Sequence, residues 1–98
     1  MAVHAEALMR SRYTAYVLKD EAYLRASWHS QTCPAELALE NDIEWLGLKV
    51  HWHKPLDANH AEVAFTARYR QNGKIYRLQE HSRFVCEQGR WLYWDARA

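Results

Sequence analysis

The hydrophobic residues of this chain change their spacing once, near its middle. Over residues 5–18 they recur three or four positions apart, which predicts an amphipathic helix. Asp20 interrupts the pattern and is a suitable N-cap for a second short helix that runs through Trp28. Helices are therefore expected over about 4–30, and residues 35–41 could add one further short helix.

From Ile43 onward hydrophobic and polar residues alternate, which is the period of a strand with one buried face. Asn72-Gly73 is the preferred pair for a two-residue hairpin turn, because both turn positions take positive φ, and Gln88-Gly89 predicts a second hairpin. Four strands are expected, over about 43–54, 61–71, 74–87 and 90–96.

The two turns also predict how the last three strands pair. The expected cross-strand pairs are Tyr69 with Tyr76, Phe65 with Glu80, Val63 with Ser82, Phe84 with Tyr93, Ser82 with Asp95 and Arg83 with Trp94. Both turns place the same residues of the third strand on the apolar face. Since a one-residue slip would turn every side chain over, this agreement favours an antiparallel meander.

Together the two patterns predict an α+β fold, with N-terminal helices packed on a four-stranded, curved antiparallel meander sheet. A length of 98 residues indicates one domain over 1–98, and 49% hydrophobic residues can form a core without a disulfide or metal. Cys33 and Cys86 are far apart and read as reduced thiols. No signal peptide or membrane-length apolar run is evident, so a cytoplasmic protein without membrane contact is expected.

Polar residues interrupt the apolar side of both predicted layers. Arg12 lies in the helical stripe, while Glu80 lies on the inner face of the sheet. An unpaired buried charge is costly, so Arg12 is expected to pair with Glu80 or to reach a wet cavity. Two interpretations stay open: a structural ion pair that docks the helix, or the polar floor of a ligand pocket. The candidate pocket residues are Arg12, Tyr13, Tyr16, Trp28, Glu80, Ser82 and Asp95.

The opposite face of the predicted sheet is basic. Its expected members are Lys49, His51, His53, Arg68, Arg70, Arg77, His81 and Arg83, with Trp94 alongside, whereas Trp52 is expected on the inner face. The candidate outer-face interface is Arg68, Arg77, Arg83 and Trp94, where Arg83 could stack on Trp94. This face could be solvated, form a homodimer or contact nucleic acid. Thirteen Lys/Arg against twelve Asp/Glu disfavour nucleic acid.

Other chemical signals in the sequence are weak. His51 and His53 could share a strand face, but a metal site needs more ligands, so neither a metal nor a cofactor is expected. In Glu80-His81-Ser82 adjacent side chains point to opposite faces, which excludes a local hydrolase triad. Glu80, Asp95 and Tyr16 could instead form an acid/base set in a cavity, which leaves open whether the domain is an enzyme.

Several segments resemble the middle domain of the bacterial YchJ-type family. They are Glu6 to Tyr16, Trp45-Leu46-Gly47-Leu48, Ala61-Glu62-Val63, Ala67-Arg68-Tyr69, Glu80-x-Ser82-x-Phe84 and Gly89-Arg90-Trp91-x-Tyr93-x-Asp95. The resemblance implies a nuclear transport factor 2-like (cystatin-like) fold, often with a cavity between helices and sheet. Members commonly carry a Cys-rich SEC-C segment, which this sequence lacks, so the chain is either a minimal member or a fragment, and the role of that segment is not transferred.

The family supplies no catalytic residues, and its fold serves several functions. The expected function is a non-catalytic module that binds a small ligand in the helix–sheet cavity or a protein on the outer face. The alternatives are a small isomerase- or hydrolase-like enzyme that uses carboxylates in that cavity, and nucleic-acid contact through the basic face.

Overall fold

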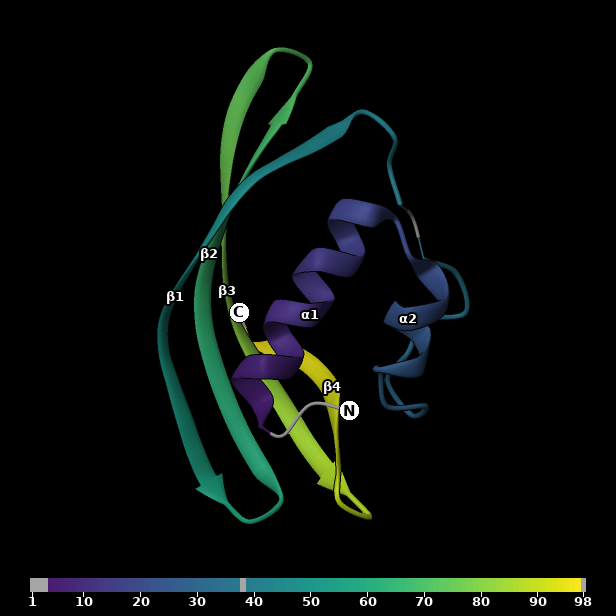
Figure 1. The fold of residues 1–98 in the computed structure, drawn as a ribbon, viewed down its shortest axis with the longest axis vertical. Helices are drawn as coiled ribbons and strands as arrows, with labels where there is room; N and C mark the ends of the chain where they lie inside the picture. Colours follow the sequence, from purple (N-terminus) through teal and green to yellow (C-terminus); the bar gives the residue numbers. More distant parts are fainter. Residues whose placement is uncertain (1–3, 38, 98) are drawn as a thin grey trace.

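The computed structural model describes residues 4–37 and 39–97. Its elements, in chain order, are helices α1 (Ala5–Leu18) and α2 (Glu21–Ala26) and strands β1 (Ile43–Asp57), β2 (His60–Gln71), β3 (Lys74–Glu87) and β4 (Arg90–Arg97). The strands form one antiparallel sheet in the order β1-β2-β3-β4. Figure 1 shows α1 lying within the curve of this sheet and the β2–β3 hairpin extending past the C-terminal end of α1. The predicted α+β meander is confirmed. In the described part of the chain, no helix is long and apolar enough to cross a membrane.

Local side-chain chemistry sets the ends of both helices. The imidazole Nδ1 of His4 accepts from the backbone N–H of Ala7 at 3.1 Å and caps α1. Lys19 ends α1 in the left-handed region, with φ of 56°. Asp20 then caps α2 as predicted, because its carboxylate accepts from the backbone N–H of Tyr23 at 3.1 Å.

The second helix is shorter than the predicted helical span to residue 30. After Ala26 the chain runs beside β4, where Ser27 O accepts from Tyr93 N at 2.8 Å and His29 N donates to Tyr93 O at 2.9 Å. These two bonds form a single parallel bridge between Trp28 and Tyr93. The outer edge of β4 therefore gains a backbone partner, and the helix gives way to that pairing.

The expectation of a further short helix over 35–41 is wrong for the described residues 35–37 and 39–41, which contain no helix. The Arg25 guanidinium donates to the carbonyls of Pro34 at 3.2 Å and Ala35 at 2.8 Å. These are carbonyls that a helix starting there would need for its first turn. At the other end of the segment, the Gln71 side-chain amide donates to Glu40 and Asp42.

The register between β2 and β3 follows the Asn-Gly turn. Asn72 and Gly73 both take positive φ, and all the predicted pairs are found, from Tyr69 with Tyr76 to Val63 with Ser82. Between β3 and β4 the pair Phe84 with Tyr93 is also confirmed. Beyond it the register shifts by one residue.

This shift places Arg83 opposite Asp95 and Ser82 opposite Ala96, so the predicted pairs of Ser82 with Asp95 and Arg83 with Trp94 are wrong. The physical reason is a bulge at Trp94, which adds a residue to β4.

Strand β1 departs further from simple alternation, with register shifts at three places. The shift between Val50 and Trp52 reverses the faces expected for the residues after it. Trp52 lies on the outer face, edge-on to His81 with ring centroids 4.9 Å apart, whereas His53 pairs with Val63 and stacks on His4 at 5.6 Å. The predicted outer position of His53 and inner position of Trp52 are both wrong. Among the described residues no metal-binding cluster forms.

The packed core occupies one half of the helix–sheet interface. The first turns of α1 bury Ala5, Leu8 and Met9 against the sheet. Their buried partners on the strands are Ala61, Val63 and Phe84. The second half of α1 carries Arg12 and two tyrosines at the corresponding positions, and there the layers do not close completely.

Candidate functional site

A partly open cavity of about 200 Å³ lies between the second half of α1 and the inner face of the sheet. Its aromatic walls are Tyr13, Tyr16, Trp45, Phe65 and Tyr93. Met9, Ala67 and Leu78 complete the apolar surface, and Arg12, Glu80 and Ser82 are the polar residues. Five of these residues come from alternate positions of β2 and β3, which the hairpin register turns toward α1, whereas Trp45 comes from β1 and Tyr93 from β4.

Arg12 is 5% exposed, and its guanidinium contacts two aromatic rings and two hydrogen-bond acceptors. The Cζ atom lies 4.8 Å from the ring centroid of Trp28 and 4.4 Å from that of Tyr93. Nη1 donates to the carbonyl of Leu24 at 2.9 Å and to Oγ of Ser27 at 2.7 Å. Arg12 thus joins α1 to the end of α2 and to β4 through two ring faces and two hydrogen bonds.

The predicted ion pair between Arg12 and Glu80 is wrong, since the described residues place no carboxylate in contact with the Arg12 guanidinium. Burial lowers the pKa of Arg12, and the nearby Tyr16, Tyr93 and Glu80 groups oppose that effect. Sequence reasoning missed the true partners because a backbone carbonyl of α2 carries no sequence signal.

Glu80 lines the cavity with one oxygen engaged and the other free. Oε2 accepts from Oγ of Ser82 at 2.5 Å and from the hydroxyl of Tyr93 at 3.5 Å. Among the described residues, Oε1 has no hydrogen-bond donor within range. Burial and the charge of Glu80 raise the pKa of Tyr93, so its hydroxyl remains a proton donor.

A cluster of aromatic rings surrounds Trp45, which lines the cavity. Tyr13 meets Trp45 edge-on with ring centroids 5.9 Å apart, and the rings of Tyr16 and Tyr69 lie at 6.2 Å and 5.4 Å. Burial raises the pKa of Tyr13 and of Tyr16, so both hydroxyls stay neutral near pH 7. Trp45 was absent from the predicted pocket. A register shift between Trp45 and Gly47 places its ring over α1, and alternation alone could not reveal that.

Two further members of the predicted pocket lie elsewhere. Trp28 stands behind Arg12, edge-on to Tyr93 at 4.9 Å, and does not line the cavity. The prediction that Asp95 lies on the inner face is wrong, because the bulge turns it outward. There it accepts two bonds from Arg83, each of 2.5 Å, and this ion pair lowers the pKa of Asp95.

The outer face is less basic than predicted. Arg68 does lie opposite Arg77, as expected. Arg83, however, pairs with Asp95 and not with Trp94, whose ring packs edge-on against His29 at 4.8 Å. Of the other predicted cations, Arg70 pairs with Glu44, and His81 hydrogen-bonds to Glu62. Local acidic partners therefore offset much of the positive charge.

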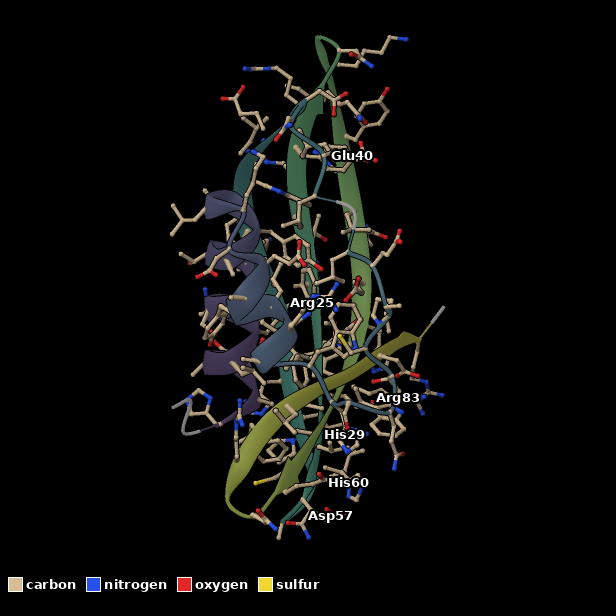
Figure 2. The ribbon with its side chains drawn as sticks, turned by 90° about the vertical axis from the view of Figure 1, so that its right-hand side faces the viewer. Arg25, His29, Glu40, Asp57, His60 and Arg83 are labelled. Atoms are coloured by element: carbon tan, nitrogen blue, oxygen red, sulfur yellow. The ribbon has the colours of Figure 1, made fainter. Side chains whose placement is uncertain are left out.

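A second, shallower hollow of about 600 Å³ lies on the outer side, near the turn between β1 and β2. Figure 2 shows His29, Asp57 and His60 gathered at this end of the molecule, with Arg83 above them. Each of these groups already has a partner: His29 contacts Glu87 at 2.9 Å, and His60 contacts Asp57 at 2.9 Å. The helix–sheet cavity is therefore the better candidate site.

Comparison with known proteins shows which family this chain belongs to. Residues 4–96 match the model described as YchJ, middle NTF2-like domain. A UPF0225 protein of Cupriavidus metallidurans is 53% identical over 97 residues, covering 93% of this chain and 69% of that protein. A UPF0225 protein of Polaromonas naphthalenivorans is 55% identical over 91 residues, covering 93% of this chain and 67% of that protein.

Two solved structures share the fold. A SEC-C motif containing protein from Rhodopseudomonas palustris superposes with a TM-score of 0.89 at 30% identity, over 98% of this chain and 79% of that one. A SEC-C motif containing protein from Psychrobacter arcticus gives 0.75 at 28% identity, over 97% of this chain and 61% of that one. With the sequence relatives, these matches show that the chain belongs to the UPF0225 family, as a YchJ-type middle NTF2-like domain.

Proposed function

We propose that this domain is a non-catalytic binding module that holds a small, largely apolar ligand in the helix–sheet cavity. The observation that carries the proposal is the cavity itself, about 200 Å³ with predominantly aromatic walls. A cavity of about 150 Å³ in another protein takes up benzene, so this one is large enough for an aromatic molecule of one or two rings. Apolar walls with a few polar groups are typical of small-molecule sites.

The same geometry argues against catalysis by the acid/base set suggested from the sequence. Asp95 lies on the outer face, so Glu80, Asp95 and Tyr16 do not converge. Ser82 is 1% exposed and its hydroxyl is held by Glu80, which leaves no accessible nucleophile there. What remains around the cavity is an arrangement that can position a ligand through shape and hydrogen bonding.

Filling the cavity provides a direct test. Leu78 lines the cavity and is 40% exposed, so Leu78→Trp should place an indole in the solvent-facing part of the cavity without overpacking the core. Ile75→Trp is the matched control, because Ile75 lies on the same strand, is 58% exposed and does not line the cavity. Naphthalene and 2-naphthol are suitable probes, with dissociation constants expected on the order of 10 µM to 1 mM.

The measurement is a titration followed by amide and indole chemical shifts, with Trp45 as the reporter in the cavity wall. We expect saturable shifts at Trp45 in the natural protein and in Ile75→Trp, and at least a tenfold weaker response in Leu78→Trp. If neither probe shifts Trp45, or if Leu78→Trp binds as well as Ile75→Trp, the cavity is not the binding site and the proposal is overturned.

A further inference from the structure

The two charged groups in the cavity wall each use only part of their hydrogen-bonding capacity among the described residues. Arg12 is covered by two ring faces and donates two hydrogen bonds from Nη1. Glu80 receives both of its hydrogen bonds on Oε2. Its other oxygen, Oε1, has no donor among the described residues, so the cavity contains an acceptor with unused capacity.

We propose that the ligand is a neutral aromatic molecule with an O–H or N–H group, and that this group donates a hydrogen bond to Oε1 of Glu80. The inference rests on the proposed binding function and adds the chemical class of the ligand. Glu80 is then the residue that determines specificity, because it is the carboxylate among the residues that line the cavity.

The charge balance of the wall favours a neutral ligand. Arg12 and Glu80 carry opposite charges and both line the cavity. An anion would enter beside the Glu80 carboxylate, and a cation would enter beside the Arg12 guanidinium. Either would also lose its hydration in an apolar space. A neutral donor avoids both repulsions and still supplies the missing partner of Oε1.

The carboxylate is also held in place before any ligand arrives. Ser82, buried on the same strand, donates to Oε2 at 2.5 Å, and Tyr93 from the neighbouring strand reaches the same oxygen. These bonds restrict the rotation of the Glu80 carboxylate, so little ordering remains to be done on binding. Ser82 and Tyr93 are therefore positioning residues for Oε1.

The test compares four compounds that share one ring system: naphthalene, 2-naphthol, 2-naphthoate and 2-naphthylmethylammonium. Binding is measured near pH 7 for the natural protein and for Glu80→Gln, which keeps a carbonyl acceptor for Ser82 while removing the charge. Glu44→Gln is the control, since Glu44 is an exposed carboxylate of β1 that pairs with Arg70 outside the cavity. Amide shifts of each free variant verify that the fold is unchanged.

For the natural protein and Glu44→Gln we expect 2-naphthol to bind about tenfold tighter than naphthalene, and both ions to bind at least tenfold weaker than 2-naphthol. In Glu80→Gln the advantage of 2-naphthol over naphthalene should fall to about threefold or less, because a neutral acceptor makes a weaker bond. Binding of 2-naphthoate should improve in the same variant. A general loosening of the cavity would instead weaken all four compounds together.

The possible results separate the two proposals. If none of the four compounds binds, the proposed binding function fails. If naphthalene binds but 2-naphthol binds no tighter, the binding function stands and the role of Glu80 is overturned. The same conclusion follows if the ratio of the 2-naphthol affinity to the naphthalene affinity is unchanged in Glu80→Gln. Binding of either ion as tightly as 2-naphthol would likewise overturn the inference of a neutral ligand.

Discussion

Arg12→Lys is expected to destabilise the domain by about 2–4 kcal/mol although it conserves the charge. Arg12 binds with a planar guanidinium that lies over two adjacent aromatic rings, at 4.8 Å and 4.4 Å from their centroids, and donates two hydrogen bonds from one nitrogen. A lysine ammonium cannot stack in this way and is more strongly hydrated, so its burial costs more.

The magnitude follows from the contacts that are lost. One charge-assisted hydrogen bond contributes about 1.5–3 kcal/mol, and a desolvated cation–π contact contributes about 0.5–2 kcal/mol. Ser27 keeps its bonds to the carbonyls of Tyr23 and Leu24, so no buried hydroxyl is left without a partner. The loss should therefore stay within the sum of these two contributions.

The assay is urea unfolding followed by tryptophan fluorescence, with the free energy of unfolding taken from linear extrapolation. Arg10→Lys on the same helix is the control, because the Arg10 side chain is 53% exposed and, within the described residues, forms an ion pair only with Glu6, expected to contribute about 0.5 kcal/mol or less. If the unfolding free energy of Arg12→Lys lies within about 0.5 kcal/mol of that of Arg10→Lys, the stacked guanidinium does not hold α1, α2 and β4 together.

Two other predictions concern acid stability and the hairpin turn. His81 and Arg97 lower the pKa of Glu62, so the folded state favours the ionised carboxylate. This ionisation stabilises the fold at pH values above the unfolded-state pKa of Glu62. The stabilisation is lost as the pH falls through the pKa of Glu62 in the folded state. Urea midpoints should therefore fall between about pH 5 and pH 3, and Glu62→Gln should flatten that slope; an unchanged slope would contradict this role. Gly73→Ala should cost about 1 kcal/mol because Gly73 has φ of 78°, whereas an added Cβ at Gly47 meets only the Arg68 side chain, at 3.7 Å. Equal thermal midpoints for Gly73→Ala and Gly47→Ala would show that the turn conformation contributes nothing.

The cavity should lower the stability of the domain, because atoms that line unfilled space lose van der Waals contacts. Leu78→Trp should therefore raise the unfolding midpoint slightly, or leave it unchanged, while blocking the probes. The contrast between unchanged stability and lost binding would distinguish a site from a structural defect.

Local signals in the sequence were sufficient for the order of elements and most of the register. The Asn72-Gly73 turn determines the pairing of β2 with β3, because a two-residue turn leaves no freedom in which residues face each other. The same alternation correctly placed Glu80 and Ser82 on the inner face, beside the helix that carries Arg12, Tyr13 and Tyr16. The family resemblance agreed with this arrangement.

What the sequence could not predict depends on contacts between distant segments. The bulge at Trp94 turned Asp95 outward, and the irregularities of β1 brought Trp45 into the cavity and moved Trp52 out of the inner face. A bulge is chosen by the packing of a whole sheet, so its position is absent from local periodicity.

The partners of Arg12 show the same division between sequence and tertiary structure. The helical stripe alone indicates that Arg12 is buried, so polar partners must offset the cost of removing its charge from water. Only the packing of α2 and β4 decides that the compensation comes from the Leu24 carbonyl, Ser27 and two aromatic rings. None of these groups is Glu80, whose Oε2 instead accepts from Ser82 and Tyr93. The sequence placed Arg12 and Glu80 at the helix–sheet interface, and the packing of distant segments decided which polar groups surround each of them.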